Sequence, residues 1–124
     1  MEIIKRTDGL TAKDLYNMTK GSSVRKMSDA KGETLDVLHY IVYKDTNSET
    51  SEISIVLSMM TTSGGIYATN SKTFIRNFLD ILAMYEDTGE EAPTKFAVNS
   101  ARSRNGREFL VCDLACEFTT KTDM

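Results

Sequence analysis

The sequence is poor in the residues that most enzymes use for catalysis. Its 124 residues include one histidine, two cysteines and no tryptophan. The histidine, His39, lies between Leu38 and Tyr40 in an apolar stretch, which predicts a structural role within a strand. A single histidine supports neither a nucleophile–base pair nor a set of metal ligands. We therefore expect a protein that is not an enzyme and that uses no metal or other cofactor.

The two cysteines are not expected to form a disulfide. Cys112 and Cys116 are four positions apart in a predicted strand. At about 3.3 Å per residue their Cα atoms would be about 13 Å apart, which is too far for a disulfide. We interpret both as small buried apolar residues.

Long apolar runs are also missing. Charged residues occur at once, at Glu2 and Lys5, which is unlike a secretory signal peptide. No apolar stretch approaches the roughly 18 residues that a membrane span requires. The sequence predicts a cytosolic protein that has no membrane partner.

Charge is unevenly distributed although the net charge is only −3. Residues 1–31 carry seven basic and four acidic side chains, and residues 94–124 carry five and four. Residues 32–70 carry one basic and five acidic side chains, and residues 71–93 carry two and five. One basic surface can coexist with an acidic total, so nucleic-acid binding is permitted but not demonstrated.

The sequence pattern predicts one domain over residues 1–124. A strand at Glu2–Arg6 and a helix at 12–20, capped by Thr11 and ended by Gly21, precede an irregular basic segment at 21–31. Strands follow at 34–44, 52–60 and 66–69, then an amphipathic helix at 71–86, and finally strands at 95–101 and 108–118. Residues 119–124 are expected to be a disordered tail.

This order of elements favours a five-stranded OB-fold barrel. Three consecutive antiparallel strands, a helix and a hairpin give the order β-β-β-α-β-β. The apolar stripe of the helix would close one end of the barrel. An open sheet with one helix on a face is the competing architecture, because strand order cannot be read from sequence.

The first long strand supplies a candidate pair for binding single-stranded nucleic acid. The face expected to point to the core carries Leu35, Val37, His39, Ile41 and Tyr43. Tyr40 and Lys44 fall on the opposite face, where a ring and a cation would suit a base and a phosphate. Tyr67 on the short third strand is similar. For both tyrosines, the alternative is an ordinary packed residue of the strand.

The last hairpin is the sharper candidate. Its turn contains Asn105-Gly106, which predicts a two-residue type I′ turn. Around that turn lie Arg102, Arg104 and Arg107, and Lys95 begins the same hairpin. Loops at this place in OB-folds contact oligonucleotides, although a solvated charged turn is the competing interpretation. Further basic residues that would extend the path are Lys72, Arg76, Lys20, Arg25 and Lys26.

Two stretches resemble the small single-stranded DNA-binding proteins of phages that infect Gram-positive bacteria. They read IYATNSKTFIRNFLDILAMY at 66–85 and KFAVNSARSRNGREFLVCDL at 95–114. The shared features are Ser-Lys-Thr at 71–73 before the helix and a Lys-Phe-x-Val strand at 95–98. The turn at 103–106 reads Ser-Arg-Asn-Gly, where the group has Ser-(Ser/Lys)-x-Gly. LTAKDLYNMTK and KMSDAKGETL upstream are similar to the same group.

The resemblance implies an OB-fold that coats single-stranded DNA during replication, in the host cytoplasm, without sequence preference. The chain departs from many bacterial relatives at its end, which reads KTDM where they carry an acidic tail that recruits partners. Replication proteins stay candidate partners, but this departure puts their recruitment by that route in doubt.

Two functions of different classes follow. The first is sequence-tolerant binding and protection of single-stranded DNA during phage replication or recombination. The second is a phage-encoded protein-interaction module that inhibits a host defence or replication protein. It would use the acidic side chains Glu33, Asp36, Asp45, Glu49, Glu52, Asp87, Glu90 and Glu91. A homodimer through barrel edges and Met59 and Met60 is compatible with the sequence, although methionine is more often core filler.

Overall fold

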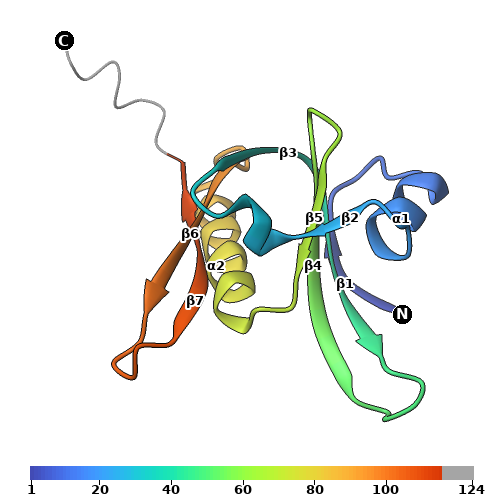
Figure 1. The fold of residues 1–124 in the computed structure, drawn as a ribbon. Coiled ribbons are helices and arrows are strands. Elements are labelled where there is room, and N and C mark those ends of the chain that lie inside the picture. Colours follow the sequence, from blue (N-terminus) through green and yellow to red (C-terminus); the bar gives the residue numbers. More distant parts are fainter. Residues whose placement is uncertain (116–124) are drawn as a thin grey trace.

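The computed structural model describes residues 1–115, and its main element is a strongly curled, mostly antiparallel sheet around a helix (Figure 1). The elements are β1 (Glu2–Arg6), α1 (Ala12–Thr19), β2 (Val24–Lys26), the 3₁₀ turn η1 (Met27–Ala30), β3 (Thr34–Thr46), β4 (Ile53–Thr61), β5 (Ile66–Thr69), α2 (Lys72–Thr88), β6 (Lys95–Arg102) and β7 (Glu108–Leu114). The predicted tail at 119–124 and Cys116 lie outside the described residues.

The sheet has the order β2-β5-β4-β3-β6-β7, and β1 adds to β3. The long strand β3 joins its two halves: Thr34 to Asp36 pair with β6, and the rest pairs with β4 and β1. In Figure 1, β3 crosses between the two halves, and α2 lies between them. The predicted order β-β-β-α-β-β is present from β3 to β7, within a mainly β, half-barrel sheet.

The sheet differs from a five-stranded barrel at the edge of β5. The segment 21–31 was predicted to be irregular, but it forms β2 and η1, and β2 pairs in parallel with β5. Met27 and Ala30 of η1 are buried in the main core. Within residues 1–115 no pairing joins β5 to β7, because β2 takes the free edge of β5. The N-terminal segment therefore occupies the seam at which a barrel would close.

Helix α2 fills the interior of the half-barrel. Ser71 caps its first turn, and Gly89 ends it in the left-handed conformation. The predicted apolar stripe consists of Phe74, Phe78, Ile81, Leu82 and Tyr85. Of these, Phe74, Phe78 and Leu82 are buried in the main core, Ile81 packs against it, and Tyr85 is half-buried. The Phe78 ring packs against Phe96 with ring centroids 5.0 Å apart.

The prediction for the core face of β3 was wrong beyond Val37. A register shift between Val37 and His39 inserts one residue, and a single extra residue inverts the alternation of a strand. Leu35 and Val37 face the main core, but beyond the shift Tyr40 and Val42 do so. The residues expected on the same face, Ile41 and Tyr43, pack instead in a second cluster under α1, with Met18 and Ile66.

Candidate nucleic-acid interface

Two hairpins project from the same side of the molecule, on either side of the start of α2 (Figure 1). One joins β3 to β4 and the other joins β6 to β7. Between and beside them the surface has two hollows, which share Asn70 as a lining residue. These hairpins and hollows hold several of the basic residues singled out from the sequence.

The β6–β7 hairpin presents two arginines at its tip. The Ser103 amide donates to the Arg107 carbonyl at 2.9 Å, and the Gly106 amide donates to the Ser103 carbonyl at 2.9 Å. Gly106 has φ 79° whereas Asn105 does not have a positive φ, so the predicted type I′ turn was wrong. The loop has three residues and ends in a left-handed glycine, which is the next most common hairpin type. Arg104 and Arg107 are exposed on it.

Arg102 has a different position from the other two arginines. Its Nη1 donates to the Gly106 carbonyl at 3.2 Å, which ties the side chain to the loop. Next to it, Glu108 accepts from Lys31 Nζ at 3.0 Å and from Ser100 Oγ at 3.0 Å. These hydrogen bonds, chiefly the one from Lys31, hold the pKa of Glu108 below its ordinary value. The negative charge of Glu108 partly neutralises the positive charge at the base of the hairpin. The tip of the hairpin keeps its positive charge.

The smaller hollow lies at the open seam between β5 and β7. It has a volume of about 400 Å³. Its apolar lining comes from several elements: Met27 of η1, Val56 of β4, Ala68 of β5 and Leu110 of β7. Polar and basic lining comes from Lys26, Ser28, Thr69 and Asn70. Lys26, considered from the sequence as an extension of a basic path, thus lies beside this hollow.

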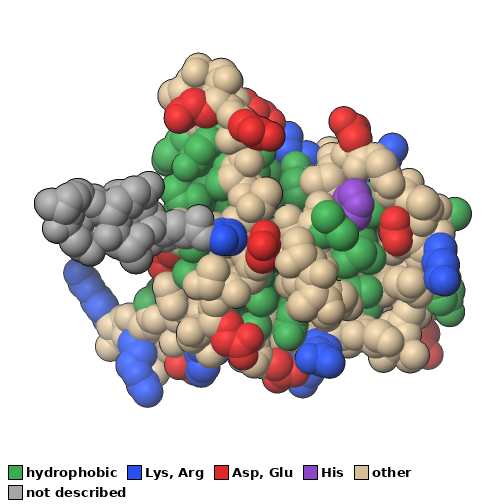
Figure 2. All heavy atoms as spheres, turned by 90° about the horizontal axis from the view of Figure 1, so that it is seen from above, with side chains coloured by type: hydrophobic (Ala, Val, Ile, Leu, Met, Phe, Trp, Pro, Cys, Tyr) green, Lys and Arg blue, Asp and Glu red, His purple; other side chains and the backbone are tan. Residues whose placement is uncertain are grey.

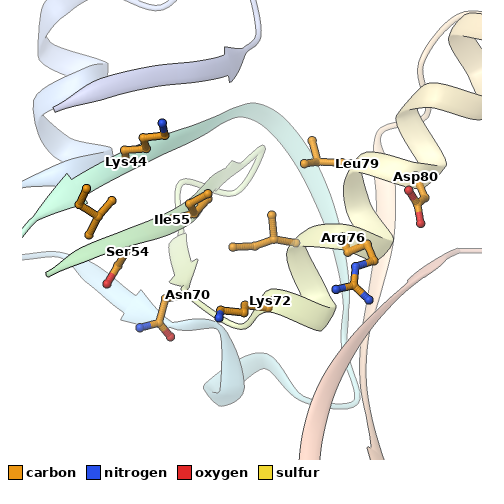
Figure 3. Close-up of a pocket in the computed structure, with 10 residues that line it drawn as sticks. Lys44, Ser54, Ile55, Asn70, Lys72, Arg76, Leu79 and Asp80 are labelled. Carbon is orange, nitrogen blue, oxygen red and sulfur yellow. The ribbon is translucent and has the colours of Figure 1, made fainter.

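The larger hollow is a groove between the β3–β4 hairpin and the first half of α2 (Figure 3). It has a volume of about 670 Å³. The fold brings Lys44 and Lys72 to it from distant parts of the sequence, together with Arg76. The remaining lining is Ile53, Ser54, Ile55, Asn70, Ile75, Leu79 and Asp80. We call this hollow the α2 groove.

Tyr40 is engaged inside the protein. Its ring meets the Phe78 ring edge-on, with centroids 5.0 Å apart, and it packs against the main core. Burial raises the pKa of its hydroxyl above the ordinary tyrosine value. Because of the register shift in β3, Tyr40 and Lys44 do not form a surface pair of ring and cation on an exposed strand face, and we do not include Tyr40 in the proposed site.

Tyr67 is half-buried on β5 and already has a cationic neighbour. The guanidinium carbon of Arg25 lies 5.9 Å from the centre of its ring. Cations above aromatic rings are attracted by the ring quadrupole. The two residues are brought together because Arg25 of β2 pairs with Tyr67 of β5. The Tyr67 ring, which was predicted to stack on a base, is therefore already in contact with Arg25.

Lys95 does not join the arginines of the hairpin tip. It starts β6, opposite Asp36 of β3, whereas Arg102 ends the same strand. At about 3.3 Å per residue, the two ends of this eight-residue strand are about 23 Å apart. The sequence placed them in one hairpin correctly, but at opposite ends of it.

Of the eight acidic side chains predicted to form one surface, Glu33 and Asp36 lie around the start of β3, and the other six gather at two further places. Asp45, Glu49 and Glu52 lie at the end of the β3–β4 hairpin, whereas Asp87 lies in the last turn of α2 and Glu90 and Glu91 follow that helix. Figure 1 shows these two places at opposite ends of the molecule. On the face seen in Figure 2, acidic side chains lie at the upper edge and across the centre, and basic ones lie mainly near the rim. That face is less suited to a polyanion than the side from which the hairpins project.

His39 and Cys112, whose side chains could in principle take part in catalysis, are both engaged in the fold. His39 Nδ1 lies 2.9 Å from the Thr7 hydroxyl, which joins β3 to the end of β1. Cys112 is buried, and burial raises the pKa of its thiol to about 12. A thiol with that pKa is almost entirely protonated near neutral pH and is a poor nucleophile.

Sequence reasoning missed the exposed isoleucines of β4 and the seam residues Asn70 and Leu110. Ile53 and Ile55 alternate with polar residues in the same phase as Leu57 and Met59, so the sequence predicts only that the four share one face. They do lie on that face, but they extend beyond α2 and are 64% and 41% exposed. The signal that could have revealed them is the length of the alternating apolar pattern in β4. That pattern is longer than the part of the strand that α2 covers.

Within residues 1–115, the histidine, cysteine and acidic side chains form no group of three or more placed to hold a metal ion. None of the helices in that part of the chain has the length and apolar character needed to cross a membrane. Neither protein-family models, nor curated proteins, nor solved structures match the chain.

Proposed function

We propose that this protein is a non-catalytic module with an OB-type barrel that binds single-stranded DNA without sequence preference. Its role would be to coat and protect DNA during phage replication or recombination. The resemblance to phage single-stranded DNA-binding proteins and the β-β-β-α-β-β order from β3 to β7 support this proposal. In OB-folds, oligonucleotides bind on the second and third barrel strands and on the two loops beside them.

The positions of Arg104 and Arg107 carry the proposal. In this order of elements, β4 and β5 correspond to the second and third strands of an OB-fold, and the two projecting hairpins correspond to its binding loops. The seam hollow lies at the outer side of β4 and β5, where Val56 and Ala68 form part of its floor. The arginine tip on one side and Lys26 on the other would contact the phosphates of a strand that crosses this hollow.

The composition of the hollow predicts how the DNA would be held. No residue that lines the described hollow is aromatic, so bases would pack against Met27, Val56 and Leu110. Base–aromatic stacking, which contributes about 1–3 kcal/mol per base in other such proteins, is not available there. Phosphate contacts therefore supply most of the affinity, and the affinity depends steeply on salt.

The test is fluorescence anisotropy with an oligo-dT at several salt concentrations, starting at about 50 mM. We expect saturable binding and a linear fall of log K with log salt. Replacing Arg104 and Arg107 together by glutamine removes two phosphate contacts, so the slope should become shallower by about 1.4. Affinity at low salt should fall in parallel.

The matched control removes the same charge elsewhere, by Arg6→Gln with Lys13→Gln on β1 and α1, where both side chains are exposed. This control should leave the slope unchanged. No binding of oligo-dT at the lowest salt would refute the proposed function. Equal slopes for the hairpin variant and the control would move the site away from the β6–β7 hairpin.

A protein-interaction module is the second candidate. The observation that favours it is the exposed acidic group at the end of α2, formed by Asp87 of its last turn and by Glu90 and Glu91 just after it. A basic groove on a host protein would be its partner. Pull-down from host lysate with and without nuclease separates the two functions, because a partner that survives nuclease together with no affinity for DNA would favour this candidate.

A further inference from the structure

The α2 groove combines an uncovered apolar floor with a cationic rim. On one side are Ile53 and Ile55 of β4, which continue the apolar face of Leu57 and Met59 beyond the end of the core. On the other side are Ile75 and Leu79 of α2. Figure 3 shows side chains of the hairpin and of α2 facing one another across the groove. Removing the exposed Ile53 and Ile55 side chains from water is favourable, so this floor favours an apolar occupant.

The rim of the groove sets the charge of that occupant. Lys44 lies on the hairpin side, and Lys72 and Arg76 lie on the helix side. Asp80 is the one acidic residue among those that line the described groove, so the lining carries a net positive charge. Lys44 Nζ has a carboxylate of Glu2 at 4.0 Å, a long separation at which a half-exposed pair contributes little. All three cations remain able to meet an anionic partner.

We propose that the α2 groove binds an acidic peptide segment of a protein partner, anchored by aliphatic side chains. The volume of about 670 Å³ lies in the range of pockets that bind ligands, and it suits a few apolar side chains. The acidic groups of such a segment would lie against Lys44, Lys72 and Arg76. Peptides that fill apolar grooves commonly present anchors at helical spacing.

The same chemistry argues against DNA as the main occupant. Single-stranded nucleic acid is usually held by rings on which bases stack, and none of the described residues that line the groove is aromatic. Four aliphatic side chains form its floor instead. The inference goes beyond the proposed DNA binding, since it uses a surface on the other side of α2 from the β6–β7 hairpin.

The experiment is a titration followed by NMR of protein labelled at the isoleucine δ1 methyl groups. The probe is a synthetic peptide in which leucines recur at helical spacing between aspartates and glutamates. We expect saturable shifts for Ile53, Ile55 and Ile75 and none for Ile41, which is buried in the cluster under α1. A peptide with serine in place of leucine, and one with lysine in place of the acidic residues, should give no saturable shifts.

Two protein variants separate the apolar and the charged contributions. Ile53→Ser changes a side chain that is already 64% exposed and should weaken peptide binding with little effect on the fold. Lys72→Glu with Arg76→Glu should weaken binding by about tenfold or more, because two rim contacts become repulsive. Lys13→Glu with Lys20→Glu on the α1 side is the matched charge control and should leave peptide binding unchanged.

The outcomes distinguish this inference from the proposed function. Oligo-dT is titrated into the same labelled sample. If oligo-dT shifts the groove isoleucines and the peptide does not, the groove is a nucleic-acid site and the inference is overturned. If neither ligand shifts them, it is also overturned. Peptide binding in the groove without any oligo-dT binding elsewhere would leave the inference standing and refute the proposed function.

Discussion

At the scale of single residues, Ser58 shows that burial alone does not secure a hydrogen bond. Its side chain is completely buried, and its hydroxyl has no partner. Ser58 pairs with Ile41 and Ala68 in the neighbouring strands, on the face that α1 covers. An unpaired buried hydroxyl costs about 1–3 kcal/mol relative to an apolar group of the same size.

We therefore expect Ser58→Ala to raise the free energy of unfolding by about 1 kcal/mol. Urea denaturation followed by circular dichroism measures the change. The matched control is Ser54→Ala on the same strand, where the serine is exposed and the change should stay within about 0.5 kcal/mol. A Ser58→Ala protein that is clearly less stable would show that the hydroxyl has a partner in solution.

The residue scale also explains why the candidate tyrosines were placed incorrectly. The sequence shows the apolar content of β3, but nothing in it marks the extra residue between Val37 and His39. That one insertion moves Tyr40 from an exposed face to the Phe78 ring. The positions of the basic residues were easier to predict, because Arg104 and Arg107 lie in a turn that their own sequence neighbours determine.

At the scale of elements, α2 holds β7 by a side chain as well as by apolar packing. The Cys112 amide donates to Asn77 Oδ1 at 3.2 Å, on the side of β7 that faces away from β6. This contact satisfies a buried amide on a strand edge, and edges left open invite pairing with other chains. The two α-helices and the longer strands were predicted correctly, since alternation and caps are local properties, whereas β2 and η1 were missed.

Asn77→Ala should lower the free energy of unfolding by about 1–3 kcal/mol, because it leaves the Cys112 amide without an acceptor. Hydrogen exchange supplies a specific measurement: the Cys112 amide should lose protection while the amides of β4 keep theirs. Asn99→Ala is the control, since Asn99 donates to Asp113 on an exposed face, and its loss should change stability little. Unchanged protection at Cys112 would contradict this role for Asn77.

At the scale of the whole molecule, the first 31 residues complete the half-barrel. Met27 and Ala30 are part of the main core, and Met18 of α1 covers the outer cluster with Ile41, Tyr43 and Ile66. The chain that follows η1 also bonds to β6, through Gly32 to Val98 and Val98 to Glu33. The β-β-β-α-β-β unit therefore does not contain all of its own core.

A chain of residues 32–124 should consequently lose cooperative unfolding and expose apolar surface. Removing Met27 alone is expected to cost about 2–5 kcal/mol, which is a large part of the stability of a small domain. Urea denaturation and binding of a hydrophobic dye measure the loss. Cooperative unfolding of residues 32–124 with the midpoint of the full chain would show that the N-terminal segment is dispensable.

The sequence by itself determined the longer strands, the amphipathic helix and the arginines of the last hairpin, because each depends on residues within a few positions of one another. Only the tertiary structure decided which edge β2 takes, where β3 shifts register, and that Lys44, Lys72 and Arg76 line one groove. These features depend on contacts between distant segments that compete for the same edge or face. The scarcity of histidine and cysteine limited the chemistry from the start, and the fold then determined which surfaces remain for binding.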